Sequence, residues 1–151
     1  MCIADRREHL PYSISIEPYQ DAFRPALRKL YLESRQASYI WLETSDYELS
    51  DFDNDVEGEQ IWVAIIDENI AGFISLWEPE NFIHHLYVSP AYIRKGVGGH
   101  LIQLAKSRYP TLSLKCMSLN KSALDFYYSQ GFTCHSKAKD ASGEYYLLTL
   151  D

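Results

Sequence analysis

The feature that most constrains the fold is a glycine-rich turn between a predicted strand and a predicted helix. Residues 82–88 favour a β-strand, which Ser89-Pro90 ends. The turn leads into Gly96-Val97-Gly98-Gly99, and apolar residues then recur at helical spacing. Because the first N–H groups of a helix have no partner within that helix, this turn is suited to bind a phosphate group.

Two other glycine-rich phosphate motifs do not fit this turn. The P-loop needs Gly-Lys-Ser/Thr after its glycines, whereas His100 follows Gly98-Gly99 here. The dinucleotide fingerprint Gly-x-Gly-x-x-Gly lies early in a βαβ unit, whereas Gly96-x-Gly98 continues to Leu101 in the second half of the chain. The glycines therefore indicate either a phosphate site of another kind or only a tight turn.

The rest of the chain shows strand and helix patterns without a repeat or linker that would divide it. We expect strands over 12–16, 60–66, 70–76, 81–88, 112–117, 133–137 and 144–150. We expect helices over 19–34, 97–108 and 121–130, and a short helix or loop in an acidic segment before residue 60. This order predicts an α/β fold (α+β mixed), one domain over residues 1–151 with 1–11 as a candidate flexible N-terminus.

The acidity of the chain is concentrated in one segment. The net charge is −7, and eight acidic residues with no lysine or arginine lie between Glu43 and Glu59. This net charge argues against a nucleic-acid partner, and without the acidic segment the rest of the chain is close to neutral. The acidic segment either attracts a cationic substrate or is a solvated loop.

Composition also bears on compartment and metal content. No stretch approaches the roughly 18 to 20 consecutive apolar residues of a membrane helix, and charges follow the first residues where an export signal would be apolar. We therefore expect a cytoplasmic protein with no membrane partner. The three cysteines show no Cys/His spacing typical of zinc, so neither a disulfide nor a metal site is expected.

Two separated motifs resemble those of the GNAT superfamily of N-acetyltransferases. Residues 86–98 are similar to the family's strand, V-x-P turn and Q/R-x-x-G-x-G/A loop. Residues 120–127, followed by Gly131-Phe132, are similar to its N-x-x-A-x-x-F-Y-x-x-x-G-F helix. The resemblance implies a mixed, mostly antiparallel twisted sheet of about seven strands flanked by about four helices, splayed between strands 4 and 5.

The resemblance implies acetyl-coenzyme A as the co-substrate, with its pyrophosphate on the glycine turn and its pantetheine arm in the splay. Ile93 stands where the family has Gln or Arg, so binding would rely on backbone amides and on Arg94. Asn120 is also a good N-cap residue, and both roles are compatible. The implied cofactor contacts are Leu86, Tyr87, Val88, Ile93, Arg94, Lys95, Gly96, Val97, Gly98, Gly99, Asn120 and Tyr127.

Acetyl transfer to an amine needs a proton donor for the departing thiolate, a base and an oxyanion donor. Tyr127 matches the tyrosine that protonates the coenzyme A sulfur in similar enzymes, and a core tyrosine is the alternative. The candidate bases are Glu80, His84 and His85, or no dedicated base. Because adjacent strand residues face opposite sides, we expect only one of the two histidines to face a given cleft. The resemblance implies the backbone N–H of Val88 as the oxyanion donor.

The acceptor is expected to bind between residues 38–59 and 134–146. The first range combines aromatic and acidic residues, as a cation-binding pocket would, or it is an acidic loop with its aromatic residues in the core. We expect direct attack by a primary amine in a ternary complex, the amine being a small basic amine, a polyamine, a peptide N-terminus or a lysine. The protein would be a monomer or homodimer. The alternative function is a non-catalytic acyl-coenzyme A binding or sensing module. The aromatic residues of the range 38–59 named above are Tyr39, Trp41, Tyr47 and Phe52.

Overall fold

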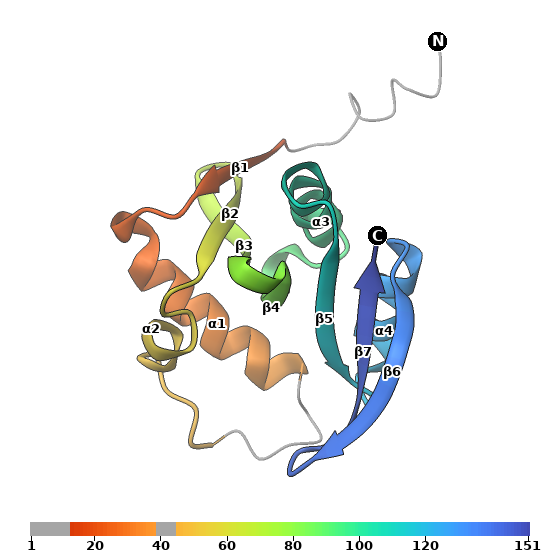
Figure 1. Ribbon diagram of the computed structural model, residues 1–151. Coiled ribbons are helices and arrows are strands. Elements are labelled where there is room, and N and C mark those ends of the chain that lie inside the picture. The colour runs from red at the N-terminus through yellow and green to blue at the C-terminus, as the bar shows by residue number, and fades with distance from the viewer. Residues whose placement is uncertain (1–12, 39–44) are drawn as a thin grey trace.

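The computed structural model of the chain describes residues 13–38 and 45–151. They form a seven-stranded sheet in the order β1-β2-β3-β4-β5-β7-β6 (Figure 1). All neighbouring strands are antiparallel except β4 and β5, which confirms the predicted mixed sheet. The strands are β1 (Ile14–Pro18), β2 (Gln60–Ile66), β3 (Asn69–Trp77), β4 (Phe82–Val88), β5 (Leu112–Met117), β6 (Thr133–Asp140) and β7 (Gly143–Leu150).

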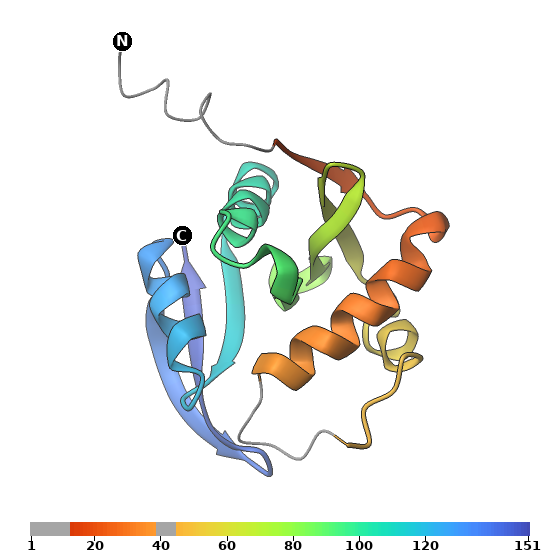
Figure 2. The same cartoon turned by 180° about the vertical axis from the view of Figure 1, so that it is seen from behind.

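The described chain has four α-helices, and these pack into two apolar cores. Both views place β2–β4 between α1 and α3 (Figure 1, Figure 2). Leu101 and Leu124 belong to the core beneath α3 and α4, whereas Leu27 and Phe52 belong to the core beneath α1 and α2. None of these helices is long and apolar enough to span a membrane. The helices are α1 (Arg24–Ser38), α2 (Asp51–Asp55), α3 (Val97–Arg108) and α4 (Lys121–Ser129).

The element boundaries agree with the sequence prediction where the local pattern is strong. The strands over 60–66 and 112–117 and the helix over 97–108 have the predicted bounds. The helix predicted from residue 19 instead starts at Arg24, because the preceding residues extend β1 and then form a 3₁₀ turn. The candidate flexible segment 1–11 lies outside the described residues.

The predicted splay between β4 and β5 is confirmed. These two strands pair only through Phe82 with Ser113 and Ile83 with Leu114. Strand β5 instead pairs along its whole length with β7. From His84 onward, β4 therefore has its sheet neighbour on one side only, at β3.

Gly72 of β3 permits the close approach of β4 and α3. A Cβ atom at this position would lie 2.8 Å from the carbonyl oxygen of Tyr87 and 3.0 Å from a side-chain carbon of Val97. The first of these atoms belongs to the backbone of β4, so it cannot move aside without shifting the strand. We therefore expect Gly72→Ala to lower the free energy of unfolding by about 1–3 kcal/mol, measured by urea denaturation.

The matched control for this prediction is Gly99→Ala. Among the described residues, a Cβ atom at Gly99 would meet the side chain of Gln130 alone, at 3.8 Å. Alanine is a better helix former than glycine by about 1 kcal/mol, so this change should be neutral or stabilising. Equal unfolding midpoints for Gly72→Ala and the wild type would contradict the prediction.

Candidate active site

The N-terminus of α3 has the form of an anion-binding site. Gly96 is its N-cap residue and has φ 82° and ψ 8°, a left-handed conformation that glycine adopts at little cost. No side chain in the described part of the chain caps this end of the helix. The N–H groups of the first turn therefore remain for an external acceptor, and Arg94 lies exposed in the turn that precedes them.

Gly98 has a packing role that the sequence did not reveal. A Cβ atom here would lie 3.0 Å from the ring of Phe126 on α4. Glycine thus allows α3 to approach α4 closely. This contact joins the glycine turn to the second sequence motif, which contains Phe126.

The second motif forms the start and the body of α4. The side chain of Asn120 accepts a hydrogen bond from the backbone N–H of Ala123 at 3.3 Å, so Asn120 is the N-cap residue that the sequence indicated. Tyr127 is partly buried, and its ring packs edge-on against Phe126 and Phe132 at centroid distances of 5.3 and 5.6 Å. Its ring therefore packs on the core.

A β-bulge in β4 lies at the point where that strand leaves β5. Ser75 of β3 pairs with His85, but the next residue, Leu76, pairs with Ile83. His84 is therefore the extra residue of the bulge. A bulge breaks the alternation of side chains, because two residues of one strand oppose a single residue of its partner.

Both histidines consequently lie beside one carboxylate, that of Glu59. His84 Nδ1 contacts Glu59 Oε2, and His85 Nε2 lies 4.0 Å from Glu59 Oε1. The premise that these two adjacent side chains face opposite sides of the strand is wrong, since their rings lie 4.2 Å apart. It assumed an unbroken strand, and the bulge removes that assumption.

Glu59 is the functional candidate that the sequence prediction missed. It directly precedes β2 and its side chain is 5% exposed. Its Oε1 accepts a hydrogen bond of 2.7 Å from the hydroxyl of Ser75 in β3. The serine at position 75, among the apolar residues of β3, was a signal for such a partner, because a buried hydroxyl needs a hydrogen bond.

The two histidines differ in their environments. The side chain of His85 is 10% exposed and that of His84 is 49% exposed. Nε2 of His85 lies 3.1 Å from the carbonyl oxygen of Asp55, and its ring packs edge-on against Tyr31 at 5.4 Å. Burial lowers the pKa of His85, and the adjacent His84 lowers it further, so the buried ring favours its neutral form.

Glu80, the third candidate base, is not part of this cluster. It is an exposed residue of the 3₁₀ turn Glu78–Glu80, which contains Pro79. The cluster of potential ligand atoms contains Glu59, His84 and His85.

Comparison with known proteins decides the family. Residues 23–132 match the family model described as the acetyltransferase (GNAT) family. The chain belongs to the GNAT family. It is 32% identical over 111 residues to the peptidyl-lysine N-acetyltransferase YiaC of Escherichia coli (strain K12), covering 72% of this chain and 75% of YiaC. The protein is therefore an N-acetyltransferase, as the two motifs predicted.

Solved structures with lower sequence identity share the fold of this GNAT chain. The PaiA N-acetyltransferase from Thermoplasma acidophilum, in complex with coenzyme A, superposes with a TM-score of 0.77 at 20% identity, covering 91% of this chain and 98% of PaiA. The apo form of YjaB from Escherichia coli gives a TM-score of 0.72 at 24% identity, covering 91% of this chain and 95% of YjaB.

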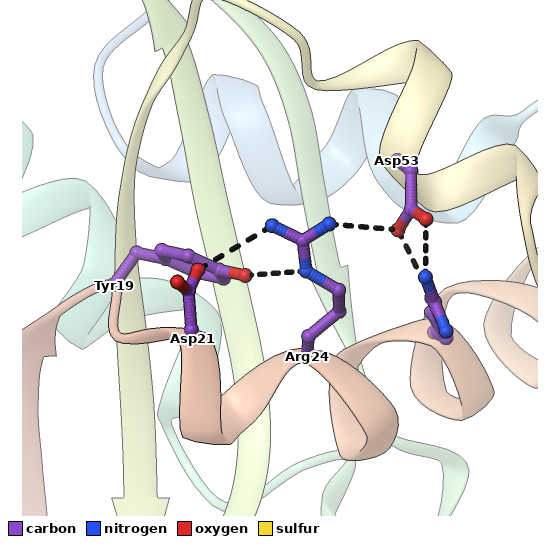
Figure 3. A network of polar contacts seen from close by, with 5 residues as sticks. Tyr19, Asp21, Arg24 and Asp53 are labelled. Atoms are coloured by element: carbon purple, nitrogen blue, oxygen red, sulfur yellow. Dashed lines mark hydrogen bonds and ion pairs between the residues drawn. The ribbon is translucent and has the colours of Figure 1, made fainter.

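The acidic segment of this GNAT chain is held against α1 by arginines. Nε of Arg28 donates to Asp53 Oδ1 at 3.0 Å, and Arg24 lies 3.9 Å from the same carboxylate. Arg24 also donates to the hydroxyl of Tyr19 at 2.9 Å and contacts Asp21 at 3.4 Å (Figure 3). Part of the acidity therefore stabilises the packing of α2 on α1.

A guanidinium group of the chain occupies the aromatic and acidic environment that the sequence assigned to a cationic substrate. Arg35 is 7% exposed and lies between the rings of Tyr31 and Tyr47, at 3.9 and 4.1 Å from their centroids. Its Nη2 donates to Asp51 at 3.2 Å. Phe52 is buried in the core, so it cannot contact an acceptor. Tyr39 and Trp41 lie outside the described residues.

The pairing of Asp53 makes a specific prediction for acid unfolding. The hydrogen bond from Arg28 lowers the pKa of Asp53 below its ordinary value of 3.8. The stabilising contribution is therefore complete above pH 3.8 and is lost as the pH falls from there toward the pKa of the folded state. We expect Asp53→Asn to lose less unfolding free energy than the wild type over this acid range, measured by urea denaturation at several pH values. If the unfolding free energies of the two proteins fall equally with pH below 3.8, this prediction is contradicted.

Proposed function

We propose that this GNAT domain transfers an acetyl group from acetyl-coenzyme A to a primary amine by direct attack in a ternary complex. The observation that carries the proposal is the contact between His84 and Glu59 at the point where β4 leaves β5. The contact holds a partly exposed imidazole at the vertex of the splay, on the strand that leads to Val88.

The described residues fit acetyl-coenzyme A as the co-substrate. The uncapped N-terminus of α3 and the left-handed Gly96 suit a pyrophosphate, which the exposed Arg94 would neutralise further. Ile93 is exposed and would contribute only its backbone. The related fold of PaiA was solved with coenzyme A, which supports this choice. The remaining proposed contacts are Leu86, Tyr87, Val88, Lys95, Val97, Gly98, Gly99, Asn120 and Tyr127.

We assign the general base to His84 and a positioning role to Glu59. An ionised carboxylate accepts but cannot donate, so Glu59 fixes the imidazole hydrogen on Nδ1 of His84. Nε2 is then the nitrogen that takes a proton from the attacking amine. Ser75 orients Glu59 in turn. His85 is packed against Tyr31 and keeps the cluster in place.

The other two groups of the mechanism come from β4 and α4. The backbone N–H of Val88 is the proposed oxyanion donor, and Ser34 of α1 donates to the carbonyl oxygen of the same residue at 3.1 Å, which holds this end of β4. Tyr127 is the proposed proton donor to the departing thiolate. Glu80 would serve as the base only through water, since it lies outside the histidine cluster.

The proposed acceptor is the lysine side chain of a peptide, with a peptide N-terminus, a polyamine and a small basic amine as other members of the class. The support is the identity of 32% to YiaC, which is named for peptidyl-lysine acetylation. We further propose that one cytoplasmic domain acts alone or as a homodimer. If the wild-type protein binds coenzyme A but acetylates none of these four classes of amine, it is instead an acyl-coenzyme A sensing module.

The role of Tyr127 is tested by removing its hydroxyl group. We expect Tyr127→Phe to lower kcat by about 10²- to 10⁴-fold, because the thiolate would lose its proton donor. The dissociation constant for coenzyme A, measured by calorimetry, should stay within about twofold, because the ring is retained. Tyr128→Phe is the matched control, since Tyr128 is exposed on the same helix. Equal kcat values for Tyr127→Phe and the control would refute the assignment.

The roles of His84 and Glu59 are tested together. We expect His84→Gln to lower kcat by about 10²- to 10⁴-fold without weakening coenzyme A binding. Since Glu59 acts through His84, Glu59→Gln should slow the wild type but should not slow His84→Gln further. His135→Gln is the control, because His135 is exposed on β6. If the losses in kcat of Glu59→Gln and His84→Gln add in the double variant, Glu59 does not act through His84.

A further inference from the structure

We propose that Glu59, His84 and His85 form a binding site for one zinc ion. One potential ligand atom from each residue lies within 4.8 Å of those of the other two. Acetyl transfer by the proposed mechanism needs no metal, so this site is a property of the chain beyond its proposed function. The argument rests on the ligand types, their supports, the local charge and the access to solvent.

The ligand types select zinc among the common divalent ions. Two imidazoles and one carboxylate form the protein ligand set of many zinc sites that keep a fourth position open. Calcium and magnesium prefer oxygen ligands, whereas imidazole suits zinc and its transition-metal neighbours. The tetrahedral geometry of zinc, with bonds of about 2.0–2.1 Å, puts ligand atoms roughly 3.3 Å apart. The separation of 4.0 Å between His85 Nε2 and Glu59 Oε1 is close to that value.

The ion would replace a hydrogen atom that is already shared, and the two atoms that share it would move apart to the zinc spacing. Nδ1 of His84 and Oε2 of Glu59 are in contact, and the hydrogen between them is bonded to Nδ1. Zinc needs the lone pair of that nitrogen, so its hydrogen moves to Nε2 of the same neutral ring. The total number of protons on the imidazole is unchanged, and the zinc form and the hydrogen-bonded form of the pair exclude one another.

Groups outside the three ligands already orient them. The buried hydroxyl of Ser75 donates to Glu59 Oε1 at 2.7 Å. Nε2 of His85 lies 3.1 Å from the carbonyl oxygen of Asp55, so its hydrogen must move to Nδ1 of the same neutral ring before Nε2 can bind zinc. Tyr31 packs against this ring and holds it in place. Such supporting contacts fix the orientation of metal ligands and typically change metal affinity by about 10- to 100-fold.

The local charge favours a divalent cation. In the described ranges 13–38 and 45–151, the ion pairs of Glu59 are with the two histidines and none is with lysine or arginine. The carboxylate of Asp55, bonded to the hydroxyl of Tyr31 at 2.6 Å, contributes a second negative charge to the surroundings of His85. The exposed side of His84 gives an ion a route from solvent, while Glu59 and His85 are shielded.

The β-bulge explains why no zinc motif is visible in the sequence. Sequence motifs for zinc depend on ligand spacings that a regular helix or turn brings together. Here two consecutive histidines lie on one side of a strand because His84 has no partner of its own in β3. The third ligand comes from the residue before β2, which is distant in the sequence.

The test measures metal binding to the full chain without acetyl-coenzyme A, after removal of metal with a chelator. We expect calorimetry to show one Zn²⁺ per chain, and Co²⁺ to give a visible absorption that Zn²⁺ displaces. Glu59→Gln and His85→Gln should each weaken Zn²⁺ binding by at least about tenfold, and Ser75→Ala by about 10-fold or more, through the loss of ligand orientation.

The control variants are His135→Gln and Cys134→Ser, which remove exposed potential ligands on β6. They should bind Zn²⁺ as the wild type does. The proposal is overturned if the wild type binds no Zn²⁺, if Glu59→Gln and His85→Gln bind it unchanged, or if a control loses it. Circular dichroism of the metal-free variants checks folding, and Ser75→Ala decides the matter if a ligand variant does not fold. Acetyltransferase activity enters none of these measurements, so the proposed catalytic role can fail independently.

Discussion

The separation of β4 from β5 after Ile83 is the constraint on which the rest of the candidate site depends. Two residue pairs join these strands, and β5 then continues alongside β7. A strand that loses a neighbour must satisfy its backbone N–H and C=O groups in another way. The later part of β4 has no sheet neighbour on the side of β5, and the same chain leads through Pro90 to the uncapped start of α3. One strand connects the histidine cluster with the uncapped N-terminus of α3.

The acidic segment shows that a run of charges in the sequence can be paired with opposite charges from another part of the fold. The sequence places eight acids together without a basic residue among them. The structure supplies the missing cations from α1, where Arg28 and Arg35 pair with Asp53 and Asp51. Both arginines lie on α1, and their aspartate partners come 16 to 25 residues later in the chain. A local sequence pattern cannot show pairs that are so far apart. Two of the eight acids therefore help to dock α2 on α1.

The fold was predictable from the sequence because its elements carry strong local signals. The helix over 97–108 combines periodic apolar residues with glycines at its start, and its bounds were predicted correctly. The histidine cluster was not predictable as a unit, because it depends on the register of β4 against β3 and on Glu59 from another strand end. One local signal did exist. The apolar residues Ile83, Leu86 and Val88 do not alternate regularly, yet all three face the core beneath α3.

The irregular spacing of Ile83, Leu86 and Val88 shows what β4 would be without its additional residue. A chain without His84 would place Ile83, Leu86 and Val88 in strict alternation, with His85 and Tyr87 on the opposite side. Such a shorter strand would satisfy the pleat and fill the same core, so the sheet itself has no need of the additional residue. The extra residue adds a second imidazole beside Glu59. One inserted residue is therefore enough to bring two histidines and a carboxylate together on a strand that otherwise only packs on the core.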